Sequence, residues 1–372
     1  MDVLSNVLRV LRLSGAVFLE AEFSAPWAVR SPPPGQLSAL FATRAECIVL
    51  FHIVAGGGCW VACAGDAPRW LGPGAMVVLP RGDEHVMSSV GGSLTPTPIT
   101  TLLPPVALDR PGRLVHGGGG PLTRMVCGYL QCEHRFEPLF GCLPRMTIVR
   151  GPGAGRDGEP DEPVFDDDGE TVVIPGDDWL TSTARFVVAQ TAEPQPGGAA
   201  ARARTVELLF LEILRRQVHE GHADGHAESH ADGHTNGHTG GRTGGRQGGH
   251  AGGPGWLAAV ADDMVGPALR LIHDDPGRGW TVEMLARAVG ASRSVFGERF
   301  AALVGEPPMH YCSHWRMHVA RRLLQEEQLS LADIAARVGY ESEAAFNRAF
   351  KRHTGAPPGR WRKEHVAAPL RT

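Results

Sequence analysis

The feature that most constrains this 372-residue chain is an internal duplication over residues 281–358. A short amphipathic helix, a turn and a second helix occur twice, with a long helix predicted between the two copies. The first copy runs from Thr281 to Pro308 and the second from Ser330 to Pro358. Each copy begins with a hydroxyl residue suited to an N-cap, has a glycine at its turn, and closes with Gly-x-Pro-Pro. The repetition predicts two equivalent helical units.

A helix, a glycine-containing turn and a second helix form the unit that places its second helix in the major groove of DNA. One such pattern is more often an ordinary helical hairpin, but two matched copies favour DNA binding. The segment Met309–Glu327 between them is a 19-residue helix candidate, which would be about 28 Å long. Successive major-groove faces are roughly 34 Å apart, so one chain could read two adjacent grooves.

Paired phenylalanines define the inward face of each second helix, namely Phe296 with Phe300 and Phe346 with Phe350. The residues expected to face DNA from the first copy are Arg293, Ser294, Gly297 and Glu298. Those from the second copy are Glu343, Asn347, Arg348 and Lys351.

The chemistry of these residues differs between the two copies. Arg348 suits guanine O6 and N7, Asn347 suits adenine, and Glu343 suits the cytosine amino group. Phosphate contacts are expected from Lys351, Arg352, Arg316 and Arg322. Gly297 and Glu298 leave the first helix poor in donors, so we predict that the second helix reads sequence. The alternative for any exposed charge is a solvated surface.

The distribution of charge agrees with a nucleic-acid partner at one end of the chain. Residues 256–372 carry 16 Lys and Arg against 13 Asp and Glu, a balance of about +3, and the rest of the chain is about −7. The seven cysteines show no disulfide framework. Residues 2–13 form one amphipathic helical face that is too interrupted for a signal peptide or a membrane span. We therefore expect a cytoplasmic protein with no membrane partner.

The N-terminal part, residues 1–150, consists of short apolar runs broken by glycine and proline, which is typical of an antiparallel β-sandwich or β-barrel. Within it, Gly72–His85 reads GPGAMVVLPRGDEH: a glycine turn, a buried strand and a Pro-x-Gly turn that ends in histidine. This stretch resembles the second conserved motif of the cupins. In that motif the final histidine faces the barrel interior.

The middle of the chain predicts helices and then a linker. Residues 151–176 are acidic and turn-rich, and we interpret them as a surface excursion. Within residues 151–220 we predict helices over 177–192 and 202–220, and the apolar stripe of the second helix either closes the barrel or forms a dimer face. That stripe comprises Val206, Leu209, Phe210, Ile213 and Leu214.

Residues 221–254 form a His/Gly-rich segment without large apolar residues, which predicts a flexible linker. Five of its histidines recur every fourth residue from His222 to His238 and suit zinc, copper or nickel. The glycines disfavour the helix that would align them. The alternative is a solvated repeat that has no ligand.

Residues 256–363 resemble the DNA-binding domain of AraC/XylS-type transcription regulators, most specifically over Asp333–Arg362. The N-terminal half resembles the cupin-like sensing domain of one branch of that family, on APW at 25–27, FHIV at 51–54, PRGDEH at 80–85 and the segment around Cys127. The resemblance implies a homodimeric, one-component regulator. Its partners would be double-stranded promoter DNA, RNA polymerase and an effector, and it would usually activate transcription. The family's base contacts fall on Ser294, Gly297, Glu298, Glu343, Asn347 and Arg348.

The expected architecture is therefore α+β and multidomain. It comprises a cupin-like antiparallel β-barrel with helices, a His/Gly-rich linker, and an all-α domain at residues 255–365 with two helix-turn-helix motifs.

The signal sensed by the N-terminal domain is left open by the sequence. Enzymatic cupins hold a metal with a His-x-His, Glu and His set, of which only His52 and His85 have counterparts, so no enzyme is predicted. One alternative is a small organic effector bound near Trp27, Phe51, His52, Trp60 and His85.

A second alternative is zinc or copper bound at His52, His85 and Cys127. A third is a thiol switch that involves the other cysteines of this half, Cys47, Cys59, Cys63, Cys132 and Cys142. Buried cysteine is also commonly just a small apolar residue.

Overall fold

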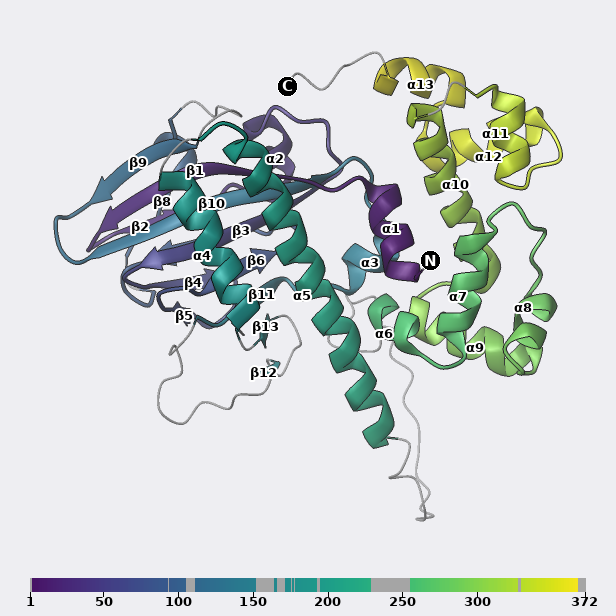
Figure 1. Ribbon diagram of the computed structural model, residues 1–372, viewed down its shortest axis with the longest axis horizontal. Helices are drawn as coiled ribbons and strands as arrows, with labels where there is room; N and C mark the ends of the chain where they lie inside the picture. The colour runs from purple at the N-terminus through teal and green to yellow at the C-terminus, as the bar shows by residue number, and fades with distance from the viewer. Residues whose placement is uncertain are drawn as a thin grey trace.

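The computed structural model describes residues 2–92, 94–104, 111–151, 164–165, 171–174, 176, 178–192, 195–228, 255–326 and 329–366. They form a β-rich N-terminal lobe and a helical C-terminal lobe (Figure 1). The strands are β1 Ser14–Ser24, β2 Ala28–Arg30, β3 Cys47–Gly56, β4 Cys59–Cys63, β5 Arg69–Leu71, β6 Met76–Leu79, β7 His85–Ser88, β8 Thr97–Pro98, β9 Gly112–Gly117, β10 Leu122–Cys132, β11 Met146–Val149, β12 Val164–Phe165 and β13 Thr171–Ile174. The helices are α1 Val3–Leu11, α2 Pro34–Leu40, α3 Glu137–Cys142, α4 Asp178–Ala192, α5 Gly198–Glu228, α6 Trp256–Ala261, α7 Val265–Asp274, α8 Val282–Ala288, α9 Arg293–Val304, α10 Pro308–Glu326, α11 Leu331–Arg337, α12 Glu343–Thr354 and α13 Pro358–Val366.

The N-terminal lobe contains two sheets, in the orders β12-β13-β11-β6-β3-β10-β1-β9 and β5-β4-β7-β2-β8. The predicted β-rich cupin-like domain is confirmed. The sheets are mixed, however, because β1–β9, β11–β13 and β2–β8 pair in parallel. No strand pairing among the described residues joins the two sheets, so they face each other as layers and do not close into one barrel.

The alternation of side chains along β3 explains how the large sheet covers two cores. Phe51 and Ile53 belong to the core beneath helix α5, whereas Leu50 and Val54 belong to the core between the two sheets. Successive side chains of a strand point to opposite faces, so this strand is apolar on both. It accordingly reads as a continuous hydrophobic run and not as an alternating one.

Helices α4 and α5 cover the outer face of the large sheet (Figure 1). The predicted apolar stripe of α5 is at most 2% exposed and packs on this sheet. It therefore closes the domain, which is one of the two roles that the sequence left open. Because this chain already covers the stripe, the alternative of a dimer face is not supported. Helix α5 also continues to Glu228, past the predicted linker boundary at 221.

The segment predicted as a surface excursion contributes to the sheet at its end. Residues 171–174 form the buried strand β13, which runs parallel to β11. Most of the preceding residues, and residues 229–254 with most of the four-residue histidine repeat, lie outside the described residues.

The C-terminal lobe contains the two predicted helical units. Thr281 and Ser330 cap the first helices by accepting from the amides of Met284 and Asp333. The turns follow at Gly290 and Gly339, whose φ angles of +72° and +78° are in the left-handed region that favours glycine. The predicted linker helix is α10, with 19 residues. Both phenylalanine pairs are fully buried.

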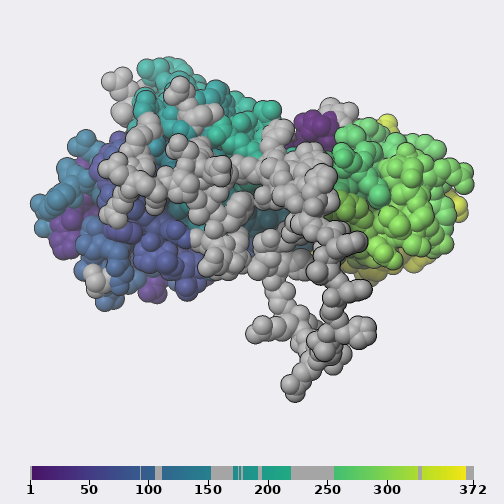
Figure 2. Space-filling view, turned by 90° about the horizontal axis from the view of Figure 1, so that it is seen from below, coloured from purple at the N-terminus to yellow at the C-terminus, as the bar shows by residue number. Residues whose placement is uncertain are grey.

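The two lobes pack against each other (Figure 2), and helix α1 lies at their junction. Helix α1 contacts α7 and α10 of the C-terminal lobe through a face that includes the buried Val3, Val7 and Val10. The predicted amphipathic helix is thus confirmed, and its partner is the C-terminal lobe of the same chain. Within the described ranges, no helix combines the length and apolar character needed to cross a bilayer.

Candidate nucleic-acid interface and effector cavity

The second helices of the two units are matched in length and in their ends. Helices α9 and α12 each contain 12 residues, begin after a capping serine, and end at a left-handed glycine. They are joined through α10, which at 1.5 Å per residue is about 28 Å long. This arrangement gives the two helices equivalent scaffolds.

Helix α12 presents a cationic outer face. Glu343, Arg348, Lys351 and Arg352 are exposed, on the side opposite the buried phenylalanines. Asn347 is half-buried, and its side-chain amide donates to the Glu343 carbonyl at 3.0 Å. This amide would have to leave that carbonyl in order to pair with a base.

Helix α9 presents fewer free groups. Arg293 is 2.7 Å from Glu283, and Arg299 donates to Asp262 at 2.9 Å. Ser294 and Glu298 are exposed, and Gly297 is half-buried. The two basic side chains of this helix are therefore already paired with carboxylates of their own lobe, which agrees with the predicted inequality of the two units.

The prediction of a phosphate contact by Arg316 is not supported by its surroundings. Its guanidinium donates to the carbonyl oxygens of Pro276 at 2.8 Å and Arg278 at 2.7 Å. Arg316 therefore holds the loop between α7 and α8 against α10. The sequence showed only a basic residue on a helix, and its carbonyl partners lie about 40 positions away. Arg322 is half-buried on the same helix.

A cavity of about 50 Å³ lies in the N-terminal lobe beside β1, β3, β7, β10 and helix α2. Its walls are mostly apolar, and its polar groups come mainly from His52, His85 and Ser31. Among the apolar walls are Phe18, Phe23, Leu37, Phe41, Met87 and Met125. The predicted ligand residues His52 and His85 do line this cavity, as does Cys127.

Three other predicted ligand residues lie elsewhere. Phe51 is on the opposite face of β3 from His52 and packs toward helix α5. Trp27 is buried in a stack on Phe23, with ring centres 4.3 Å apart. Trp60 packs edge-on against Trp70. The prediction of a direct role for these three in the cavity is wrong, because composition does not show which strand face turns inward.

The two cavity histidines are hydrogen-bonded to each other, with 2.9 Å between their Nε2 atoms. His85 Nδ1 is also 2.9 Å from the Asp83 carbonyl, which can only accept, so this nitrogen carries the proton. His85 Nε2 must then accept from His52 Nε2. Burial lowers the pKa of His52 far below its ordinary value and that of His85 to about 4, so both rings are neutral.

This proton assignment leaves His52 Nδ1 as an acceptor. The atom is buried and has no hydrogen-bond partner among the described residues. A buried acceptor without a partner costs free energy of folding, roughly 1–3 kcal/mol. A ligand that donates one hydrogen bond would satisfy it.

The thiols are buried and do not form a reactive or metal-binding group with the histidines. Cys59 and Cys127 are fully buried, and burial raises the pKa of the Cys59 thiol to about 12 and that of Cys127 still further. Protonated thiols are poor nucleophiles and poor metal ligands. His52, His85 and Cys127 do not form a group of three ligand atoms within 4.8 Å of one another, although all three are described.

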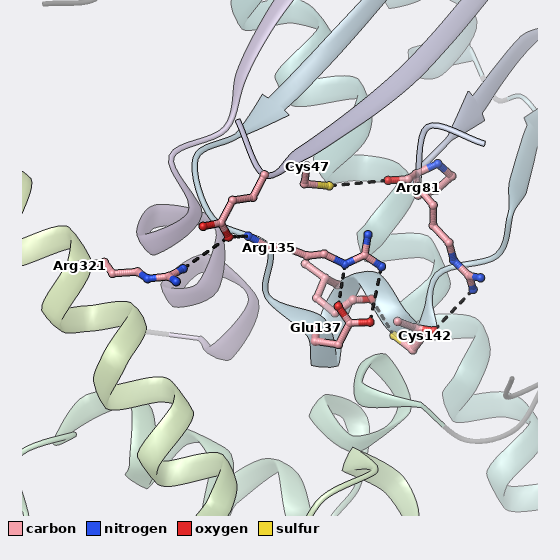
Figure 3. Close-up of polar contacts among 10 residues, drawn as sticks. Cys47, Arg81, Arg135, Glu137, Cys142 and Arg321 are labelled. Atoms are coloured by element: carbon pink, nitrogen blue, oxygen red, sulfur yellow. Dashed lines mark hydrogen bonds and ion pairs between the residues drawn. The ribbon is translucent and has the colours of Figure 1, made fainter. Parts of the chain in front are cut away.

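Polar contacts near the junction of the lobes lie where β3 begins and β10 ends (Figure 3). Arg321 of α10 extends across the junction to Glu46, at 3.5 Å, and Glu46 also accepts from the backbone amide of Arg135 at 3.0 Å. Burial raises the pKa of the Glu46 carboxyl, but its contacts with His134 and Arg321 outweigh this effect and lower it to about 2.

Phe136, just after β10, anchors the same junction. It is fully buried, and its ring packs edge-on against Trp256, Tyr311 and Trp315 of the C-terminal lobe. Sequence reasoning had no signal for this contact, because Phe136 reads only as the start of a short helix.

These features define a class of protein: a cupin-type domain with an apolar cavity, docked against a tandem helix-turn-helix domain. Comparison with known families agrees. Residues 2–166 match a family described as Cupin, and residues 285–364 match one described as Helix-turn-helix domain.

Individual relatives differ in how much of this chain they match. A putative AraC-like transcription regulator of Streptomyces lividans is 50% identical over 109 residues, which are 29% of this chain and only 36% of that protein. The HTH-type transcriptional regulator AlkR of Acinetobacter baylyi is 24% identical over 98% of this chain and the whole of that protein. A solved DNA complex of the AdpA DNA-binding domain is 27% identical and covers 30% of this chain and 99% of that one, with a TM-score of 0.28.

The matched domains and the descriptions of these relatives point the same way. The chain carries a cupin domain and a helix-turn-helix domain, and it is similar to AraC-type transcription regulators.

Proposed function

We propose that this chain is a one-component transcription regulator, in which the helical lobe binds promoter DNA and the cupin lobe binds an effector. The observation that carries the proposal is the pair of equivalent helices, α9 and α12, on either side of α10. Helix α12 bears the exposed Arg348, Lys351 and Arg352, and it is assigned the main sequence-reading role. Helix α9 contributes mainly shape and backbone contacts.

The effector is proposed to be a small and mostly apolar organic molecule with one hydrogen-bond donor. The apolar walls of the cavity exclude a strongly charged ligand, because burying an unpaired charge is costly. Neutral His52 offers one acceptor, at Nδ1. A metal ion at His52, His85 and Cys127 is the weaker alternative, since their ligand atoms do not all lie within 4.8 Å of one another. A catalytic role is not proposed.

Signal transfer is proposed to run along β3 and β10. These neighbouring strands line the cavity through His52 and Cys127, which are directly paired on the adjacent strands β3 and β10. β3 begins at Cys47 and β10 ends at Cys132, next to Glu46, which contacts Arg321 of α10. Five residues of strand span about 16 Å, so a shift at the cavity is transmitted over a short and rigid path.

We further propose that the regulator is a cytoplasmic homodimer that recruits RNA polymerase and usually activates transcription. The outer faces of α4 and α5 expose Trp179 (46%), Phe186 (44%) and Leu208 (53%). Exposed apolar side chains of this size are typical of interaction surfaces when they form a patch. Sedimentation velocity of the wild type and of a Leu208→Glu variant tests this part, and an unchanged monomer–dimer balance would remove it.

Genome-wide footprinting of the bound chain tests the proposed function as a whole. The wild type should protect a small set of promoter sites that share a motif. Arg348→Ala should protect these sites more weakly and relax the motif at one base pair, whereas the matched variant Arg204→Ala, at an exposed arginine of the cupin lobe, should retain both the sites and the motif. Binding without any shared motif would show that the chain is not a sequence-specific regulator.

A further inference from the structure

A cluster of metal-binding side chains lies outside both proposed sites, at the start of α10. Glu306 belongs to the Gly305–Pro308 turn that closes the first helix-turn-helix unit, and His310 and His314 are in the first two turns of α10. Side chains four residues apart on a helix lie on the same face. All three residues therefore meet on one side of the junction between α9 and α10.

The distances within this cluster are close to those of a metal site. Glu306 Oε2 is 2.6 Å from His310 Nδ1 and 3.0 Å from His314 Nδ1. All three ligand atoms lie within 4.8 Å of one another. Zinc binds imidazole nitrogen at about 2.0–2.1 Å and carboxylate oxygen at about 2.0–2.2 Å, so tetrahedral ligands lie roughly 3.3 Å apart. Small rotations of the side chains are enough to admit the ion.

The hydrogen bonds seen in this cluster leave part of it unsatisfied. Both imidazoles point Nδ1 at the same carboxylate oxygen, Oε2. The other oxygen, Oε1, is buried and has no partner among the described residues. His310 is 62% exposed, so a neutral ring can carry its proton on a solvated Nε2 and leave Nδ1 free for a metal, whose bond would replace the hydrogen bond from Nδ1 to Glu306 Oε2.

We infer that Glu306, His310 and His314 form a binding site for a divalent transition metal of the zinc type, with water completing the coordination. Two imidazoles and a carboxylate suit zinc and its neighbours in the first transition row. The ion would fix the closing turn of the first helix-turn-helix unit to the linker helix. His314 also lies beside His353 of α12, with ring centres 5.3 Å apart, so the site adjoins the second unit. This inference does not depend on the proposed effector cavity.

The experiment uses the full chain with the seven histidines of residues 219–250 replaced by asparagine, because that tract would otherwise compete for metal. Zinc affinity is measured by competition with a chromophoric chelator, and coordination by the absorption spectrum of the Co²⁺ form. We expect the chain to bind one equivalent of zinc tightly. His310→Asn or His314→Asn should each weaken this binding by more than the 10- to 100-fold that losing an outer partner typically costs. Glu306→Gln should also weaken it.

His116→Asn, on β9 at the far end of the cupin lobe, is the matched control and should leave zinc affinity unchanged (Figure 1). Circular dichroism in the presence of chelator establishes that each variant is folded. We expect the variants to fold because both histidines are partly exposed. The site is refuted if the tract-free chain binds no zinc, or if His310→Asn and His314→Asn bind it as tightly as their parent. A thiolate-to-cobalt charge-transfer band would also refute it, because that band would place the metal on cysteine.

Discussion

Truncation of Phe136 to alanine should undock the two lobes. The ring is fully buried, with its centre 5.6 Å from that of Trp256, 6.1 Å from Tyr311 and 5.8 Å from Trp315. A buried Phe→Ala change costs about 3–5 kcal/mol. These three partners all belong to the C-terminal lobe, so we expect much of this loss to fall on the docking equilibrium.

Helix α1 reports on that equilibrium. It has nine residues and packs on α7 and α10, and an isolated helix of this length is marginal in water. Each 1.4 kcal/mol changes an equilibrium constant tenfold. A loss of 3–5 kcal/mol therefore raises the equilibrium constant for separation of the two lobes by roughly 100- to 4000-fold. Hydrogen-exchange mass spectrometry of peptides from residues 2–13 should therefore show far faster exchange in Phe136→Ala.

Two control variants separate undocking from general instability. Phe136→Leu retains most of the apolar volume and should cost less than about 1.5 kcal/mol. Phe23→Ala weakens the core between the two sheets, which does not include the C-terminal lobe. Equal acceleration of α1 in Phe23→Ala and Phe136→Ala, or no acceleration in the latter, would refute the assignment of Phe136 as the docking anchor.

Three further predictions follow from individual side chains. Arg348→Ala should cost about 1–3 kcal/mol of specific DNA binding and relax selectivity at one base pair, measured by competition with substituted operators; unchanged selectivity would contradict the role of α12. Arg316→Ala should lower the urea stability of the helical lobe, because hydrogen bonds to charged groups contribute about 1.5–3 kcal/mol. It should leave unchanged the slope of log binding constant against log salt concentration; a slope reduced by about one would show that Arg316 does contact a phosphate. Burial lowers the pKa of His273 to about 3. Between about pH 6.5 and 3 this histidine is protonated in the unfolded chain but neutral in the folded chain, so the free energy of unfolding should fall as the pH drops through that range. His273→Phe should make that dependence shallower in urea titrations, while His52 and His85, whose pKa values are also lowered, keep part of it; an unchanged slope would show that other groups cause it.

The helical lobe was predicted from sequence because its information is local. Capping residues, turn glycines and apolar spacing repeat twice, and the helices, their ends and the burial of Phe346 and Phe350 follow from those patterns. The β-rich class of the N-terminal half was predictable for the same reason. Its pocket was not, because moving one residue along a strand reverses the face, and Phe51 and His52 therefore serve different cores.

The sequence by itself determined that this chain carries two equivalent helix-turn-helix units, and it predicts that the second is better equipped to contact bases. Both conclusions rest on residues within a few positions of one another, where helical geometry leaves little freedom. Only the tertiary structure decided the features that depend on long-range contacts. These are that Arg316 binds backbone carbonyls of its own lobe, that the apolar stripe of α5 covers the sheet, and that Phe136 joins the two lobes. The free energy of these contacts comes from partners that lie tens to hundreds of residues away, and no local pattern records it.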